Sequence, residues 1–135
     1  MIQSDIKKIV EDLIETFLDA GKISLDLREK GLTKEIKSDN TPVSNGDLEV
    51  NKILIKRISE LTPNIPIVSE ETSENKSRDN LENFWLIDPI DGTYDYINNL
   101  DEFTINAGLI IQKKPAAGLI YAPAKNRMFY SYGDE

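Results

Sequence analysis

The stretch Phe84-Trp85-Leu86-Ile87-Asp88-Pro89-Ile90-Asp91-Gly92-Thr93 decides both the fold and the chemistry expected of this 135-residue sequence. It is an apolar run of strand character that ends in two carboxylates, Asp88 and Asp91. A second run of the same design, Ile65-Pro66-Ile67-Val68, leads to Glu70-Glu71. Ligands of such sheets bind beyond the carboxyl ends of the strands, so these carboxylates converge at one edge if the two strands are neighbours.

Carboxylates gathered at such an edge need a partner of opposite charge. Like charges a few ångströms apart raise each other's pKa, and no arginine-rich segment lies nearby in the sequence. A divalent cation is the natural partner. Oxygen ligands select hard ions, which favours Mg²⁺ first, then Mn²⁺ or Ca²⁺. The backbone carbonyl of Ile90 is a further oxygen donor between the two aspartates.

The residues around and after the aspartates are suited to a bound anion. Pro89 holds Asp88 in an extended conformation. Gly92 allows the backbone to approach an anion closely, and Thr93 opens a short helix predicted over residues 93–97. A helix N-terminus offers free N–H groups to phosphate. Carboxylates that bind metal, placed beside such a helix start, are what the hydrolysis of a phosphate ester requires.

The rest of the chain predicts an α+β fold, with helices layered on a mixed, mostly antiparallel sheet. Apolar residues three and four apart indicate a helix from an N-cap at Ser4 to a stop at Gly31, weakened at Gly21. A second helix follows Asp47 and ends before Thr62-Pro63-Asn64. Turn clusters are expected at 38–42 and 123–126, a polar loop at 72–82, and strands at 34–37, 65–68, 84–87, 103–112, 116–122 and 128–132.

Composition excludes several classes of protein. The chain has no cysteine and no histidine, so it forms no disulfide, no zinc site of the Cys/His type and no Ser-His-Asp triad. Its net charge of −8 argues against binding a nucleic-acid polymer. Its apolar runs are far shorter than the roughly 18 residues of a membrane span. We expect a cytoplasmic protein, and leave peripheral membrane contact and homo-oligomerisation open.

Each motif alone has a simpler interpretation. Glu70-Glu71 alone is typical of solvated loop charges, and Asp88 to Thr93 alone is typical of a turn whose aspartate caps the next helix. Asp47 alone fits an N-cap or a charge in the first turn of the second helix, and Lys37 alone fits an exposed side chain. These interpretations together describe an acidic α+β interaction domain without a metal site.

Taken together, the segments resemble the inositol-monophosphatase-like, Mg²⁺-dependent phosphatases. The matching residues are Lys37-Ser38-Asp39-Asn40-Thr41-Pro42-Val43-Ser44 with Asp47, Val68-Ser69-Glu70-Glu71, and Trp85 to Thr93. Within that superfamily the chain is most similar to the CysQ-type 3′(2′),5′-bisphosphate nucleotidases, through Thr41-Pro42-Val43, Glu102-Phe103-Thr104-Ile105-Asn106 and Tyr121-Ala122-Pro123. The resemblance implies the N-terminal part of an α-β-α-β-α sugar-phosphatase fold.

The resemblance also implies a Mg²⁺ site with two or three ions. The implied metal ligands are Glu70, Asp88, the carbonyl of Ile90, and Asp91, with Asp88 bridging two ions. Asp47 and Thr93 would form a hydrogen-bonded pair that, with Glu70, orients and deprotonates the attacking water. The implied substrate contacts are Glu70, Ile90, Asp91, Gly92 and Thr93. The implied reaction is in-line attack of metal-activated water on the 3′(2′)-phosphate of adenosine 3′,5′-bisphosphate, a small-molecule phosphate ester, without a phosphoenzyme.

The sequence departs from the family in one respect. The family supplies a further metal-binding aspartate from its C-terminal half, at a helix start that contains Trp-Asp, whereas the one tryptophan here, Trp85, is followed by Leu86. We interpret residues 1–135 as the N-terminal metal-binding portion of a phosphatase, without the C-terminal α/β portion. We therefore expect exposed apolar surface with self-association, a weakly bound second metal, and slow or no turnover.

Two other functions stay open from the sequence. One is an inositol monophosphatase or sugar phosphatase of the same superfamily. The other is an inactive remnant that binds metal or phosphate without turnover.

Overall fold

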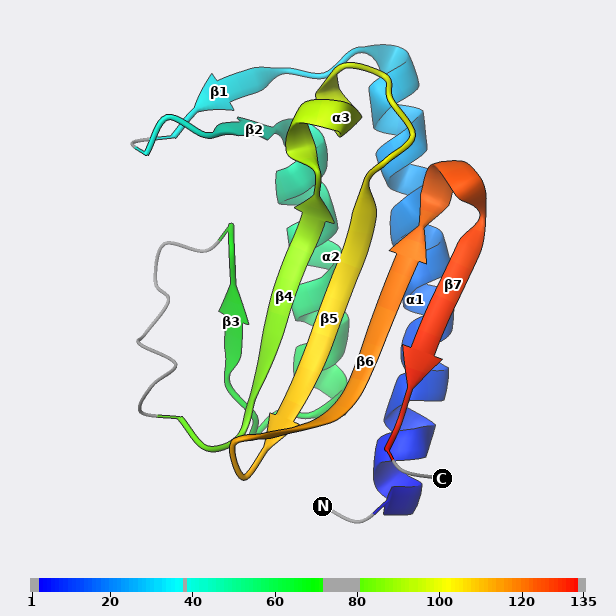
Figure 1. The fold of residues 1–135 in the computed structure, drawn as a ribbon, viewed down its shortest axis with the longest axis vertical. Helices are drawn as coiled ribbons and strands as arrows, with labels where there is room; N and C mark the ends of the chain where they lie inside the picture. The colour runs from blue at the N-terminus through cyan, green and yellow to red at the C-terminus, as the bar shows by residue number, and fades with distance from the viewer. Residues whose placement is uncertain (1–2, 38, 72–80, 134–135) are drawn as a thin grey trace.

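The structure is a computed structural model that describes residues 3–37, 39–71 and 81–133. Two long helices, α1 (Gln3–Lys30) and α2 (Asn45–Leu61), cover one face of a five-stranded sheet (Figure 1). None of the helices in these ranges is long and apolar enough to cross a membrane. The polar loop expected at 72–82 falls mostly outside the described residues.

The main sheet has the strand order β3-β4-β5-β6-β7. β3 pairs with β4 in parallel, and the other neighbouring pairs are antiparallel. The expected α+β class with a mostly antiparallel sheet is therefore confirmed. The strands are β3 (Ile67–Ser69), β4 (Phe84–Asp91), β5 (Thr104–Ile111), β6 (Lys114–Ala122) and β7 (Arg127–Ser131).

Three smaller elements complete the described chain. β1 (Lys34–Ile36) and β2 (Pro42–Ser44) form an antiparallel pair between the two long helices, α3 (Thr93–Ile97) follows β4, and the 3₁₀ turn η2 (Pro123–Lys125) joins β6 to β7. The sequence places residue 42 in a turn and predicts no strand at 42–44. That expectation is wrong because β2 depends on pairing with β1, which is a contact between segments and not a local preference.

The first helix is unbroken because it buries a continuous stripe against the sheet. Val10, Leu13 and Phe17 are fully buried, and burying a side chain of this size stabilises the fold by about 1.5–3 kcal/mol. The helix continues through Gly21 to Lys30, as the sequence predicts. A Cβ added at Gly21 would lie 2.4 Å from a ring carbon of Tyr121, so this glycine permits the close approach of α1 and β6.

The last turn of α1 holds the segment that follows α3. Arg28 Nη1 donates a hydrogen bond of 2.7 Å to the carbonyl of Leu100, and Arg28 Nη2 lies 3.6 Å from a carboxylate oxygen of Asp101. The guanidinium carbon is also 5.0 Å from the centre of the Phe103 ring. One side chain thus supplies a hydrogen bond, an ion pair and a cation–π contact.

The opposite face of the sheet is apolar, and no described element covers it. Ile120 and Phe129 lie opposite each other on β6 and β7, with exposed fractions of 46% and 57%. Gly108 lies opposite Gly118 on β5 and β6, and a hollow of about 580 Å³ runs across this face. The expected exposed apolar surface is present, and self-association through it stays a prediction.

Gly46 provides a test of the packing between α2 and α3. A Cβ at this position would lie 2.1 Å from Tyr96 Oη, and the buried Tyr96 hydroxyl donates a 2.7 Å hydrogen bond to the carbonyl of Ser24. Gly46→Ala is expected to lower the free energy of unfolding by about 1–3 kcal/mol, measured by urea denaturation. Gly108→Ala is the control, because no atom lies within 4 Å of the added Cβ. Equal stabilities for the two variants would contradict this packing.

The open face gives a second test, on the 135-residue chain itself. We expect concentration-dependent self-association in sedimentation velocity, because water leaves the apolar pair of Ile120 and Phe129 when two such faces meet. The double variant Ile120→Thr/Phe129→Thr should shift the chain toward monomer. Leu18→Gln, at an exposed position on α1, serves as the control. A wild-type chain that stays monomeric at high concentration would exclude self-association.

Candidate active site

The two carboxylate-bearing turns are neighbours in the structure. Ser69 lies opposite Ile87 in the parallel register of β3 and β4, and the Glu70 N–H donates a 3.1 Å hydrogen bond to the Ile87 carbonyl. Glu70 is therefore held beside Asp88, the next residue of β4. The sequence made the convergence of the carboxylates conditional on these two strands being neighbours, and the structure meets that condition.

The β4 strand does not end at Ile87, as the sequence suggests, but continues to Asp91. Its pairing with β5 shifts between Asp88, which faces Asn106, and Asp91, which faces Thr104. Three steps along β4 thus match two steps along β5, which is the geometry of a β-bulge. The bulge leaves Asp88 half-buried, Ile90 buried and Asp91 exposed.

The environment of Asp88 is strongly acidic. The pKa of Asp88 is raised to about 6, and burial is the largest cause. The remaining causes are the charges of neighbouring carboxylates, in decreasing order Asp91, Glu70, Glu71 and Asp47. The other four carboxylates therefore lie within electrostatic range of Asp88 and repel its charge. This repulsion is the physical reason why a cation would bind at this edge of the sheet.

Asp47 is fully buried and both of its carboxylate oxygens are hydrogen-bonded. Oδ2 accepts from the Ser44 N–H at 2.8 Å and from the Ser44 hydroxyl at 2.5 Å, while Oδ1 accepts from the Thr93 hydroxyl at 2.8 Å. The Asp47–Thr93 hydrogen bond implied by the resemblance is present, and its catalytic role stays a prediction. Ser44, not Asp47, is the N-cap of α2, and Asp47 occupies the N3 position of a capping box.

Gly92 adopts a backbone conformation that few other residues tolerate. Its φ and ψ are 91° and 43°, and an added Cβ would lie 2.8 Å from the Glu102 carbonyl oxygen. This left-handed turn lets α3 begin at Thr93 directly after the aspartates, as the sequence predicts. The Thr93 hydroxyl also lies 3.2 Å from the Ile90 carbonyl oxygen, so one side chain contacts both the buried aspartate and the bulge.

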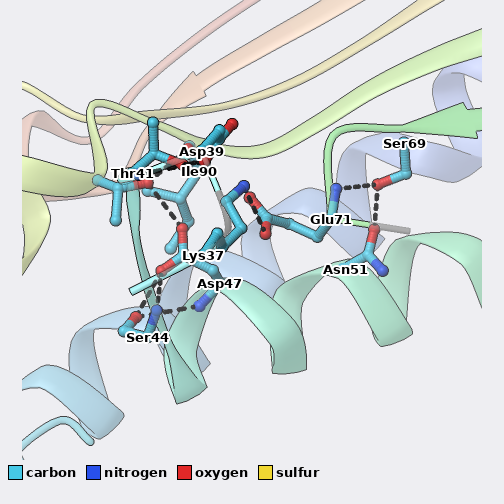
Figure 2. A network of polar contacts seen from close by, with 10 residues as sticks. Lys37, Asp39, Thr41, Ser44, Asp47, Asn51, Ser69, Glu71 and Ile90 are labelled. Atoms are coloured by element: carbon cyan, nitrogen blue, oxygen red, sulfur yellow. Dashed lines mark hydrogen bonds and ion pairs between the residues drawn. The ribbon is translucent and has the colours of Figure 1, made fainter. Parts of the chain in front are cut away.

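Three polar residues near the site, Lys37, Asn51 and Ser69, make contacts that the sequence did not predict. Lys37 is not simply exposed: its Nζ lies 3.4 Å from Glu71 Oε1, and the Glu71 side chain is only 6% exposed. Burial raises the pKa of Glu71, and the Lys37 charge offsets part of that rise. Asn51 and Ser69 continue this polar network at the other side of Glu71 (Figure 2). In the sequence only the doublet Glu70-Glu71 indicates this polar network, because the other partners of Glu71 come from distant segments.

The donor set has the chemistry of a magnesium site, but its side chains are not gathered into a ready cluster. Among residues 3–37, 39–71 and 81–133, no three Asp or Glu side chains lie close enough together to hold a metal ion as they stand. Glu70 and Asp91 are exposed and thus have room to rotate toward Asp88. A carbonyl oxygen has two lone pairs, so Ile90 retains one beside its contact with Thr93. All of these donors are oxygen atoms, as Mg²⁺ prefers.

Comparison with known proteins places the chain in a family. The profile of the inositol monophosphatase family matches residues 5–134. The chain belongs to the inositol monophosphatase family. The resemblance found in the sequence motifs is therefore confirmed at the level of the family.

Curated relatives of this family member include two bacterial 3′(2′),5′-bisphosphate nucleotidases named CysQ. The Haemophilus influenzae protein is 37% identical over 117 residues, which are 85% of this chain and 44% of the relative. The Aggregatibacter actinomycetemcomitans protein is 35% identical over 125 residues, which are 91% and 46% of the two chains. The chain thus spans about half the length of the curated relatives it matches.

Solved structures share the fold of this family member. CysQ from Bacteroides thetaiotaomicron matches with a TM-score of 0.74 and 28% identity, covering 98% of this chain and 47% of that chain. The SuhB protein of Bartonella henselae matches with a TM-score of 0.82 and 23% identity, covering 93% and 49%. The layered arrangement of helices and sheet described above is therefore the arrangement in the matching half of these proteins.

The raised pKa of Asp88 gives a test that needs no substrate. A carboxyl whose pKa is higher in the folded state than in the unfolded state makes the fold less stable as the pH rises from about 4 to about 6. Asp88→Asn removes this cost and should stabilise the metal-free chain at pH 7.5 by about 1 kcal/mol, since Asp88 is only half-buried and solvent screens it. At pH 4 the two proteins should be equally stable in urea denaturation.

The control for this comparison is Asp26→Asn, at an exposed position on α1. Millimolar Mg²⁺ should stabilise the wild type more than Asp88→Asn, because only the wild type keeps the full set of carboxylates. A stability difference between Asp88→Asn and the wild type that does not change with pH would show that repulsion at Asp88 is not its cause.

Proposed function

We propose that this chain forms the metal- and phosphate-binding part of a Mg²⁺-dependent phosphomonoesterase that hydrolyses the 3′(2′)-phosphate of adenosine 3′,5′-bisphosphate. The CysQ relatives support this substrate, since they are 3′(2′),5′-bisphosphate nucleotidases at 35–37% identity over most of the chain. The single observation that carries the proposal is the buried Asp47–Thr93 hydrogen bond beside the acidic edge of the sheet.

The proposed metal ligands are Glu70, Asp88, the carbonyl of Ile90, and Asp91. A solved structure of the same fold, an IMPase/NADP phosphatase, is a complex with Mg²⁺ and phosphate, and it matches this chain with a TM-score of 0.81 at 19% identity. Mg²⁺ bound here, with two or three ions in the site, would lower the pKa of a coordinated water and neutralise charge on the phosphate. Asp88 is the proposed bridging ligand, as the resemblance to the family implies, and burial and the neighbouring carboxylates raise its pKa in the absence of a cation.

The Asp47–Thr93 pair would orient the attacking water. A hydroxyl has one hydrogen, and the 2.8 Å contact with Asp47 is shorter than the 3.2 Å contact with Ile90, so we assign the hydrogen to Asp47. The lone pairs of the Thr93 oxygen are then left to accept a hydrogen bond from water. Both oxygens of Asp47 are engaged, so Glu70 is the proposed group that takes the proton of that water.

The phosphate itself would be held by backbone N–H groups. Gly92 and Thr93 stand at the turn between β4 and α3, directly after Asp91. Ile90, Asp91 and Glu70 complete the proposed substrate contacts. The chain has no histidine or cysteine, which agrees with direct attack by water and no phosphoenzyme.

The described residues support the proposed metal and phosphate contacts more directly than the identity of the leaving group. An inositol or sugar phosphate would use the same described residues, and the solved inositol monophosphatase from Thermotoga maritima shares the fold with a TM-score of 0.80 at 24% identity. Binding of metal and phosphate without turnover is the remaining alternative, and the coverage of about half of each relative keeps it open. A cytoplasmic location belongs to the proposal as well.

Thr93 provides the test of the proposed reaction. Thr93→Val removes the hydroxyl at nearly constant size and should reduce the rate of Mg²⁺-dependent phosphate release from adenosine 3′,5′-bisphosphate by about 10²–10⁴-fold. Thr93→Ser keeps the hydroxyl and should lose less than about tenfold. Neither variant should change Mn²⁺ affinity in calorimetry, because Thr93 is not a proposed ligand.

The same assay with inositol 1-phosphate decides between the two leaving groups. If inositol 1-phosphate is hydrolysed faster, the substrate is a polyol phosphate and not the nucleotide. A wild-type chain that binds Mn²⁺ and phosphate but releases no phosphate from either substrate would establish the alternative without turnover.

A further inference from the structure

Helix α2 contacts both of the turns that carry the proposed site. Asp47, in its first turn, binds Thr93 after β4. Asn51 lies four residues later, on the same face of the helix and one turn further along. Asn51 reaches Ser69 at the end of β3 (Figure 2). Two positions on one helix are thus linked to the ends of two neighbouring strands.

The contact of Asn51 with Ser69 fixes the turn at Glu70 and Glu71. The Ser69 hydroxyl donates a 2.5 Å hydrogen bond to Asn51 Oδ1 and accepts a 3.2 Å hydrogen bond from the Glu71 N–H. Ser69 is fully buried, so its hydroxyl has a fixed environment. The orientation that donates to Asn51 also leaves the oxygen lone pairs free to accept from Glu71. The two hydrogen bonds therefore support each other.

The turn is held on its other sides as well. The Glu70 N–H is bonded to the carbonyl of Ile87, and the Glu71 side chain is paired with Lys37. The backbone on both sides of the exposed Glu70 side chain is thus fixed to β4, to α2 and to the end of β1. Glu70 itself has an exposed side chain on a backbone held by these hydrogen bonds.

Asparagine suits this position for an electrostatic reason. Its amide oxygen accepts the Ser69 hydrogen as a carboxylate oxygen would, yet it adds no charge beside the carboxylates of Glu70, Glu71 and Asp88. An aspartate would keep the hydrogen bond and add one more negative charge to an edge where burial and repulsion already disfavour ionisation.

We propose that Asn51 is a positioning residue: through the Ser69 hydroxyl it sets the Glu70–Glu71 turn relative to the Asp47–Thr93 pair, so that α2 aligns both parts of the site. This inference rests on the proposed function for the meaning of that alignment. Asn51 is not itself among the proposed metal ligands or substrate contacts. Its loss should therefore act on divalent-cation affinity through the backbone at Glu70.

The first experiment measures the turn itself and needs neither metal nor substrate. Asn51→Leu removes the acceptor at similar size, and hydrogen exchange of the Glu71 amide, followed by NMR, should become at least tenfold faster. Asn51→Asp keeps an acceptor oxygen and should retain the slow exchange. Ser59→Ala, at an exposed position on the same helix, is the control for general effects on α2. Unchanged exchange in Asn51→Leu would overturn the inference.

The second experiment measures Mn²⁺ affinity by calorimetry. Asn51→Leu and Ser69→Ala should each weaken binding by about tenfold, as losses of outer-shell hydrogen bonds do. The double variant should be no weaker than Ser69→Ala alone, since loss of the Ser69 hydroxyl already removes its contact with Asn51 together with the one from the Glu71 N–H. Asn51→Asp should bind within about threefold of the wild type. Additive losses in the double variant, or an equal loss in Asn51→Asp, would overturn the positioning role.

The two experiments separate failure of the inference from failure of the proposed function. If the wild type binds no Mn²⁺ while Asn51→Leu still speeds exchange at Glu71, the alignment by α2 stands and the proposed metal site is wrong. If the wild type binds Mn²⁺ and Asn51→Leu changes neither affinity nor exchange, the metal site stands and the role of Asn51 is wrong.

Discussion

The buried carboxylate of Asp47 is the interaction on which the arrangement of the site depends. An ionised group without solvent costs several kcal/mol unless its oxygens are hydrogen-bonded. Here Ser44 satisfies one oxygen and Thr93 the other, and these partners come from segments up to 46 residues away in the sequence. The start of α2 and the turn after β4 cannot separate without depriving Asp47 Oδ1 of its Thr93 partner, so this hydrogen bond holds the start of α3 to α2.

The carboxylates at the acidic edge of the sheet lower the stability of the fold, because they repel the charge of Asp88. Hydrophobic burial of the two long helices against the sheet is large enough to tolerate a half-buried Asp88 among four other carboxylates. Only Lys37 supplies a positive charge to this network in the described residues, and it is paired with Glu71. Local repulsion that the rest of the structure compensates is typical of a site shaped for a ligand and not for stability alone.

The features foreseen from the sequence are those that local pattern encodes. The apolar runs before Glu70 and Asp88 and the glycine before Thr93 were sufficient to predict two strands that end together beside a helix start. From the sequence Asp47 fits either an N-cap or a charge in the first turn of the second helix, and the structure shows the second because Ser44 takes the cap position. The β-bulge after Asp88 has no sequence signal in β4 alone, since it exists only relative to β5. The partners of Lys37 and Gly21 likewise depend on which distant segments meet.

The contacts of Arg28 impose an order on folding. This residue lies in α1, but the carbonyl that its guanidinium binds lies 72 residues further along the chain. Contacts between such distant segments form late, because the intervening loop must first close. The Arg28 guanidinium therefore stays in water until residue 100 has been made, after β3 and β4 but before β5, β6 and β7, and its contacts with the segment after α3 form only then.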